Sequence, residues 1–336
     1  MIMATRRFAL IWVAGLALAS WLVQTPPVRA DGAARALGIL KKSIEIEGQV
    51  PLKGEVATVL QLEEEQCIVR YRVLQKPPYM FRLEYLEPQV LEGQLVVCDG
   101  STRWLYDQQS KIAFLSAAPD QFSLKRERMK DLNTIRRRFD VNLLGVGTIV
   151  GRDAYVIQLV RKRAPLTSRK FWVDTQTFVV LRNERLAADG SLLAAKGFVS
   201  VDLSPDELDD ASFSFEPPEG AQTISEPAPF FVAYDPLEAQ KRVGFQIRLP
   251  QMLPPDFYLQ DVCLVDFKGR PVAWLRYTDS LNYVSVFERL LPPGASPPSE
   301  PPHPQMVVGK VGDLNVVIVG TLPVEFLFWV ANSLPP

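Results

Sequence analysis

The chain has 336 residues, of which 47% are hydrophobic and 22% are charged, and its formal net charge is −1. This length predicts two domains or one large domain, and the composition excludes a disordered chain. The near-neutral charge gives no sign of nucleic-acid binding by the surface as a whole. The single histidine, His303, excludes a multi-histidine metal site within one chain. Because His303 lies in the proline-rich stretch PPGASPPSEPPHPQ, we interpret it as an exposed loop residue and not as a catalytic base.

The N-terminal segment has the pattern of an export signal. Arg6 and Arg7 precede sixteen uncharged, mostly apolar residues, and Val28 and Ala30 occupy the small-residue positions of a cleavage site. We predict that residues 1–30 form a Sec-type signal peptide that is removed after Ala30. An uncleaved anchor is the alternative, because the apolar stretch approaches the ~20 residues of a spanning helix. Either outcome places the remaining chain in the periplasm or another extracytoplasmic compartment.

The three cysteines, Cys67, Cys98 and Cys263, lack the spacing of a metal or redox motif. In an oxidising compartment Cys67 and Cys98 are candidates for a disulfide, because both lie in apolar, strand-like runs. Three buried free thiols are the alternative, and Cys263 in DVCLVDF has the pattern of a core position. No metal site and no cofactor is predicted.

Short strand patterns dominate the first two thirds of the chain. A helical pattern over residues 31–47 is followed by apolar or alternating runs such as GEVATVLQL, QCIVRYRVLQ, YMFRLEYL and TRWLYDQ, which are separated by turn compositions. Strands resume at FDVNLLGVGTIVG and continue as a meander that ends near Phe215. Regular short strands with tight turns predict an antiparallel sheet that is built by successive pairing.

Residues 120–138 interrupt the strands with a weak helical pattern in which basic residues outnumber acidic ones. One interpretation is a solvated helix face packed beside the sheet. The other is a docking patch for an acidic partner or for anionic lipid headgroups. The candidate docking residues are Arg126, Arg128, Arg136 and Arg137.

A change in composition predicts the domain boundary. Sixteen of the chain's 28 prolines fall between Pro217 and Pro304. We therefore predict a first domain at 31–216, a proline-rich linker at 217–240 and a second domain at 241–336 with a disordered loop at 292–305. The final segment PVEFLFWVANSL predicts a helix whose apolar face covers a small sheet.

The residues favour binding over catalysis. No phosphate-binding glycine loop follows a strand, and neither a G-x-S-x-G elbow nor an S-x-x-K motif is present, so no enzyme activity is predicted. A curved antiparallel sheet has an apolar face that must be filled by its own side chains or by a ligand. Residues i and i+2 share a face, and of the adjacent pair Phe171 and Trp172 only one can face a cavity. The candidate groove residues, for which plain core packing is the alternative, are Leu83, Tyr85, Trp104, Tyr106 and Trp172.

Two stretches carry a resemblance to a known family. The first is FDVNLLGVGTIVGRDAYVIQLVRK, continuing to FWVDTQTFVVLRNERLAADGSLLAAKGF, and it is similar to the half-barrel strands of LolA-like carriers. The second comprises LPQMLPPDFYLQD, WLRYTDSLNYVSVFE and LNVVIVGTLPVEFLFWVANSL. Together they resemble the MucB/RseB family of periplasmic regulators of the extracytoplasmic sigma-factor response. Ser280 stands where that family's Y-T/S-D-G turn has glycine.

This resemblance implies an α+β fold. Its N-terminal domain is a LolA-like antiparallel half-barrel closed by helices, and its C-terminal domain is a small α+β unit with a terminal helix. It also implies a regulatory function: binding of the extracytoplasmic part of a membrane anti-sigma factor, shielding of that factor from proteolysis, and release by lipid or misassembled envelope material. A lipid or lipoprotein carrier is the alternative function, and a ligand-free structural domain is a third. The expected partners are therefore an anti-sigma factor and acyl chains, with no nucleic acid; a homo-oligomer is left open.

Overall fold

The computed structural model describes residues 30–336 apart from 62–65, 90, 119–120, 164–166, 207, 226–233, 255, 267–269, 281, 293–305 and 323. The predicted signal segment up to residue 29 and most of the predicted loop at 292–305 lie outside the described residues. No helix in the described part of the chain combines the length and apolar character needed to cross a membrane.

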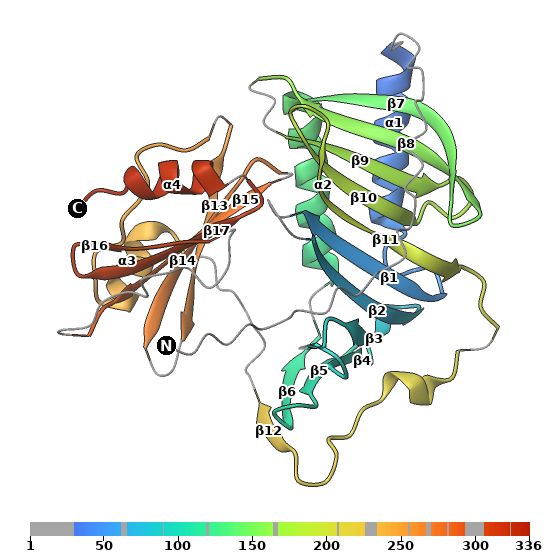
Figure 1. Cartoon of the computed structure of the whole chain (residues 1–336), viewed down its shortest axis with the longest axis horizontal. Helices are drawn as coiled ribbons and strands as arrows, with labels where there is room; N and C mark the ends of the chain where they lie inside the picture. Colours follow the sequence, from blue (N-terminus) through green and yellow to red (C-terminus); the bar gives the residue numbers. More distant parts are fainter. Residues whose placement is uncertain are drawn as a thin grey trace, which may run out of the picture.

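A twelve-stranded sheet forms the N-terminal part of the molecule (Figure 1). Its order is β12-β6-β5-β4-β3-β2-β1-β11-β10-β9-β8-β7, and all neighbours pair antiparallel except β12 and β6, which are parallel. The strands are β1 (Leu52–Gln61), β2 (Gln66–Lys76), β3 (Met80–Glu87), β4 (Leu95–Cys98), β5 (Thr102–Asp107), β6 (Ile112–Ala117), β7 (Phe139–Ile149), β8 (Arg152–Arg161), β9 (Thr167–Asp174), β10 (Val180–Ala187), β11 (Leu192–Asp202) and β12 (Gln222–Ser225).

Two helices, α1 (Ala30–Glu45) and α2 (Gln121–Arg138), pack on one face of this sheet, which we call the helix face. In α1, Ala36, Ile39 and Leu40 recur at helical spacing and are buried against Ile157 and other strand residues. Helix α1 packs mainly on β7 and β9, and α2 packs on β7. On the same side of the sheet, strands β1 to β5 make few contacts with either helix. The predicted antiparallel sheet with accompanying helices is confirmed.

A short segment crosses the opposite, outer face of the sheet. It contains the 3-10 helix η1 (Asp210–Phe213) and Phe215, and we call residues 208–216 the strap. The Lys76 ammonium donates hydrogen bonds to the Leu208 carbonyl at 2.9 Å and to Asp210 at 2.5 Å. Phe213 is 1% exposed, and the Phe215 ring lies 5.4 Å from the ring of Tyr106. The strap therefore buries part of the outer face.

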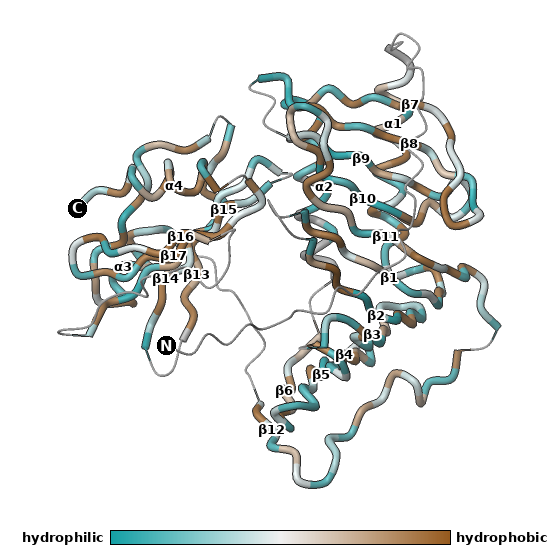
Figure 2. Tube along the Cα trace, in the orientation of Figure 1, coloured by the Kyte–Doolittle hydropathy of each residue, from teal (hydrophilic) through white to brown (hydrophobic). Residues whose placement is uncertain are grey.

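A second sheet forms the C-terminal domain, with strand order β13-β14-β15-β17-β16 and antiparallel pairing throughout. Its elements are α3 (Pro236–Val243), β13 (Tyr258–Asp266), β14 (Pro271–Thr278), β15 (Tyr283–Leu290), β16 (Met306–Val311), β17 (Leu314–Gly320) and α4 (Val324–Asn332). In both sheets the strands change between hydrophobic and hydrophilic residues along their length (Figure 2).

Local signals specify helix α3, and an apolar face anchors helix α4. At α3, Asp235 caps the N-terminus by accepting from the Leu237 and Glu238 amides, Pro236 opens the first turn, and Gly244 ends the helix at φ 76°. In α4, Leu327 and Val330 are fully buried against the sheet. The predicted terminal helix that covers a small sheet is thus confirmed. Strand β12 and the first turns of α3 fall within the segment 217–240 that we interpreted as a linker.

The cysteine prediction is corrected by the strand order. Cys67 lies near the start of β2, and Cys98 ends β4, with β3 between the two strands. Cys98 pairs with Phe81, which pairs with Gln75, whereas Cys67 pairs with Leu60 in β1. The two thiols are therefore separated both along and across the sheet, and all three cysteines are free thiols. The predicted Cys67–Cys98 disulfide is wrong.

Glu288 of β15 is a fully buried acid in the C-terminal domain. Its Oε2 accepts the Arg248 amide at 2.9 Å, and no described group pairs with its Oε1. Burial raises the pKa of Glu288 to about 7, although the Arg248 amide and charge oppose this rise. Burial, with Glu288 as a second cause, also raises the pKa of the neighbouring Tyr277.

The raised pKa of Glu288 predicts a pH-dependent stability. Between pH ~4.3, the ordinary pKa of glutamate, and pH 7, the folded chain holds a proton that the unfolded chain has lost, so stability falls as the pH rises. We expect the free energy of unfolding, measured in urea, to fall by about 3 kcal/mol from pH 4.5 to pH 8 through this group. Glu288→Gln should flatten the profile, and Glu238→Gln on the exposed side of α3 should not. An unchanged profile in Glu288→Gln would contradict the assignment.

The two domains meet through buried polar groups. Arg161, which ends β8, forms an ion pair with Asp279 in the turn between β14 and β15, and the two residues are 4% and 0% exposed. Asp279 also accepts from the Asn282 amide at 2.6 Å, and the Arg185 guanidinium donates to the Thr321 carbonyl. The Arg161 guanidinium lies 5.6 Å from the Phe257 ring centre. The Tyr277–Ser280 turn noted in the sequence is therefore one of the parts of the C-terminal domain that dock on the large sheet, together with Phe257 and Thr321.

Candidate functional site

An apolar groove lies on the helix face, between the C-terminal end of α1, Arg128 of α2 and strands β1, β2, β3, β9, β10 and β11. Its volume is 670 Å³. The strand register places its lining on one face, because Leu83 pairs with Val73 and Tyr71 pairs with Val56 across neighbouring strands. The apolar groove is lined chiefly by Ile44, Ile46, Val50, Leu52, Val56, Tyr71, Val73, Phe81, Leu83, Phe171, Val179, Leu181 and Phe198.

Polar side chains are a minority in the lining of the apolar groove: they are Ser43, Glu47, Gln75, Arg128, Asn183 and Lys196. Arg128 of α2 forms an ion pair with Glu47, just beyond the end of α1, and both residues border the groove. The Lys196 ammonium lies 5.7 Å from the Tyr71 ring centre, in cation–π range. An apolar lining with a few charges at its border suits a ligand that has a long apolar part and a polar end.

Leu83 and Tyr85 lie on the same face of β3, as alternation predicts, and that face is the helix face. Leu83 lines the apolar groove. The Tyr85 ring packs 5.5 Å from the Tyr71 ring, next to the groove. Burial is the largest cause that raises the pKa of Tyr85 above its ordinary value.

Trp104 and Tyr106 share a face, but the strand register places it on the outer side. In β4, Val96 pairs with Leu83 and with Leu105, so the flanking residues of β5 point away from the apolar groove. Both rings contact Phe215 of the strap, at centroid distances of 5.7 and 5.4 Å. Their predicted position in the groove is wrong, because the strap, a segment distant in sequence, covers them.

The adjacent residues Phe171 and Trp172 of β9 face opposite sides of the sheet, as predicted. The sequence-based candidate for the groove was Trp172, and the structure reverses this choice. Phe171 lines the apolar groove. Trp172 faces the outer side, where its ring lies so close to Gly147 that a Cβ built there would approach it to 2.8 Å. The placement of Trp172 in the groove is therefore corrected. Alternation alone could not choose between the two, since the choice depends on which face the helices cover.

The four candidate docking arginines do not form one patch. Arg128 borders the apolar groove, whereas Arg136 borders a different cleft. Arg137 is exposed, and its carbonyl accepts a hydrogen bond from the Lys162 ammonium at 3.4 Å. The side chain of Arg126 lies outside the described residues.

Several groove residues carried a signal in the sequence. Tyr71 and Val73 alternate with arginine in QCIVRYRVLQ, a pattern that gives one apolar and one polar face. By contrast, Phe198 and Leu181 are brought to the groove by the pairing of β11 with β1 and β10, which local sequence does not reveal.

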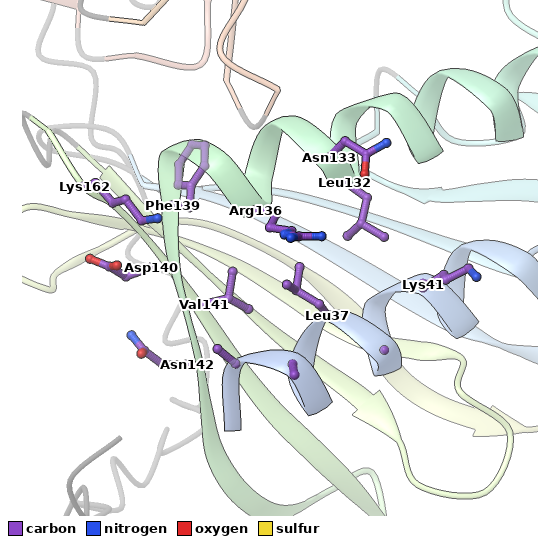
Figure 3. Close-up of a pocket in the computed structure, with 13 residues that line it drawn as sticks. Leu37, Lys41, Leu132, Asn133, Arg136, Phe139, Asp140, Val141, Asn142 and Lys162 are labelled. Atoms are coloured by element: carbon purple, nitrogen blue, oxygen red, sulfur yellow. The ribbon is translucent and has the colours of Figure 1, made fainter. Parts of the chain in front are cut away.

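The second cleft lies between α1, α2 and the start of β7, and we call it the α1–α2 cleft (Figure 3). Its volume is 950 Å³. Leu37 of α1, Leu132 of α2 and Val141 of β7 contribute apolar side chains, and charged residues from all three directions border it. Among the described residues, no group of three or more histidine, cysteine or acidic side chains could hold a metal ion.

The fold and its clefts define a class of protein: a large antiparallel sheet with an apolar groove, joined to a small α+β domain. Residues 82–217 match the family model described as the MucB/RseB N-terminal domain. This match confirms the resemblance to the MucB/RseB family.

Solved structures and a curated relative extend the comparison. The Pseudomonas aeruginosa MucA/MucB complex contains a chain that is 19% identical to this one, with a TM-score of 0.62 over 90% of this chain and 99% of that chain. MucB in complex with MucA(peri) gives a TM-score of 0.60 at 19% identity, over 90% and 98% of the two chains. An uncharacterized protein of Methanocaldococcus jannaschii is 28% identical over 218 residues. This alignment spans 63% of the present chain and 60% of that relative.

Proposed function

We propose that this chain is a non-enzymatic, periplasmic regulatory protein that binds the extracytoplasmic part of an anti-sigma factor. The observation that carries the proposal is the likeness of both domains to MucB, which has been solved in complex with MucA. The matched family model over residues 82–217 supports it. We also assign the described sheet to the LolA-like half-barrel architecture, with α1 and α2 as its closing helices.

The partner proposal is tested by capture and reconstitution. The full chain with a C-terminal tag is purified from its own envelope, and proteins bound to it are identified by mass spectrometry. We expect recovery of a single-pass membrane anti-sigma factor, whose purified extracytoplasmic part then binds the chain and becomes resistant to proteolysis. Repeated failure to recover any such protein would contradict the proposal.

A second function, the binding of acyl chains, is favoured by one observation: the apolar groove of 670 Å³ on the helix face. We propose that lipid or lipoprotein acyl chains occupy this groove. Acyl chains bound there would provide the means by which envelope stress acts on the regulator. In the alternative function, a lipid or lipoprotein carrier without a regulatory role, the same groove would hold the acyl chains during transport.

Leu83→Asp is expected to weaken binding of a fluorescent fatty-acyl probe at least tenfold. The substitution removes apolar contact and places a charge against the chain, and each effect costs at least about 1 kcal/mol. Val199→Asp is the matched control, because Val199 is 49% exposed and does not line the groove. A wild-type protein that neither co-purifies with acyl chains nor binds the probe would exclude this second function.

A further inference from the structure

The α1–α2 cleft is distinct from the apolar groove and carries a different set of groups. Cations border it from three elements: Lys41 on α1, Arg136 on α2 and Lys162 just after β8 (Figure 3). Asp140 is the acid in its lining. The cleft is therefore basic around an apolar base, and its charge is complementary to an acidic ligand.

The three cations are not equally engaged. Lys41 pairs with Glu45 at 3.6 Å on the exposed side of α1, and Lys162 donates to the Arg137 carbonyl at 3.4 Å. The Arg136 side chain is exposed and makes no hydrogen bond or ion pair with the residues that the structure describes. Its guanidinium is thus available for a carboxylate, with which it can form two parallel hydrogen bonds.

The cleft also borders an open edge of the large sheet. Among the residues that the structure describes, β7 is the last strand of this sheet and pairs only with β8. The Lys162 amide donates to the Arg138 carbonyl at 3.0 Å, so the pair Arg138–Lys162 is hydrogen-bonded. In an antiparallel ladder such pairs alternate with pairs whose main-chain groups point away from the partner strand. By this alternation the main-chain groups at the start of β7 that point away from β8 belong to Phe139, Val141 and Leu143. Because α2 ends at Arg138, the Phe139 amide closes the last turn of that helix, so the groups left for a further strand are the Phe139 carbonyl and the amides and carbonyls of Val141 and Leu143.

These outward-pointing groups favour one kind of ligand. A row of free amides and carbonyls at a sheet edge is a template for another extended chain. Regular pairing in β7 runs only as far as the irregularity between Leu143 and Gly145. Its first residues, Phe139–Asn142, line the cleft. A peptide paired there would set alternate side chains toward the apolar base of the cleft and its acidic side chains within reach of Arg136 and Lys162.

We propose that the α1–α2 cleft binds an extended, acidic peptide segment of the protein partner, which adds to the edge of β7 while its carboxylates pair with Arg136 and Lys162. The site rests on the proposed partner-binding function and gives it a location. It is separate from the apolar groove, so peptide and acyl ligands would occupy different places.

Photo-crosslinking in the full chain tests the location. A benzoylphenylalanine residue is introduced at Asn142, beside the cleft, or at the exposed Val199 as a control. The partner is then captured from the envelope. We expect a crosslink only at position 142, and we expect the crosslinked stretch of the partner to be acidic. In the complex, hydrogen exchange of the Val141 and Leu143 amides should slow at least tenfold.

A charge reversal tests the recognition. Arg136→Glu is expected to weaken binding of a synthetic peptide of the crosslinked sequence at least tenfold, whereas Lys310→Glu, exposed on β16, should change it less than twofold. If the partner is captured but position 142 does not crosslink and Arg136→Glu binds the captured partner normally, this site is wrong and the proposed function stands. If no partner is captured, both fall. If Arg136→Glu lowers affinity only for phosphatidylglycerol vesicles, the cleft binds lipid headgroups and the peptide proposal is overturned.

Discussion

Arg161→Ala is expected to destabilise the docked arrangement of the two domains by about 3–5 kcal/mol, because it removes one partner of a buried ion pair. Arg161 and Asp279 are almost completely buried. In the variant the Asp279 carboxylate keeps its hydrogen bonds to Asn282 at 2.6 and 3.1 Å but loses the opposite charge. Urea unfolding should report the lower stability, and the radius of gyration in small-angle scattering should rise as the domains separate.

The exposed pair Arg72–Glu84 is the control. Its atoms are 3.8 Å apart and its side chains are 63% and 47% exposed, so Arg72→Ala should cost no more than about 1 kcal/mol. The double variant Arg161→Met, Asp279→Asn removes both buried charges and should recover part of the loss. If Arg161→Ala costs no more than Arg72→Ala, the buried pair does not hold the domains together.

Phe213→Ala is expected to lower the free energy of unfolding by about 3–5 kcal/mol, because it truncates a fully buried aromatic side chain. Phe213 is 1% exposed in the strap, and its loss should loosen the segment that covers Trp104. The intrinsic fluorescence of the folded chain should therefore shift towards that of a solvent-exposed tryptophan.

Glu216→Ala, at an exposed position of the same strap, should leave both stability and fluorescence nearly unchanged. If Phe213→Ala behaves like Glu216→Ala, the strap is not a structural part of the sheet. The outer-face position of Trp104 and Tyr106 would then have to be explained by the strand register alone.

Period-two alternation was sufficient for the pairing of side chains within a strand. It correctly grouped Leu83 with Tyr85 and Trp104 with Tyr106, and it separated Phe171 from Trp172. It could not say which group faces the helices, because that choice depends on the strand order and on what covers each face. For Trp104 and Tyr106 the covering segment is the strap, which is about a hundred residues away in sequence. The predicted Cys67–Cys98 disulfide was wrong for the same reason, since local strand patterns do not show that β3 separates the two thiols.

The sequence by itself determined the antiparallel sheet, the terminal helix and the family resemblance, because alternation, turn composition and helix caps are local properties of the chain. Only the tertiary structure decided three further features: the groove on the helix face, the Arg161–Asp279 contact between the domains and the open edge of β7 beside Arg136. Each of them requires elements that are distant in the chain to meet. Such contacts arise from the burial of shared apolar surface and the pairing of buried charges, which no short stretch of sequence specifies.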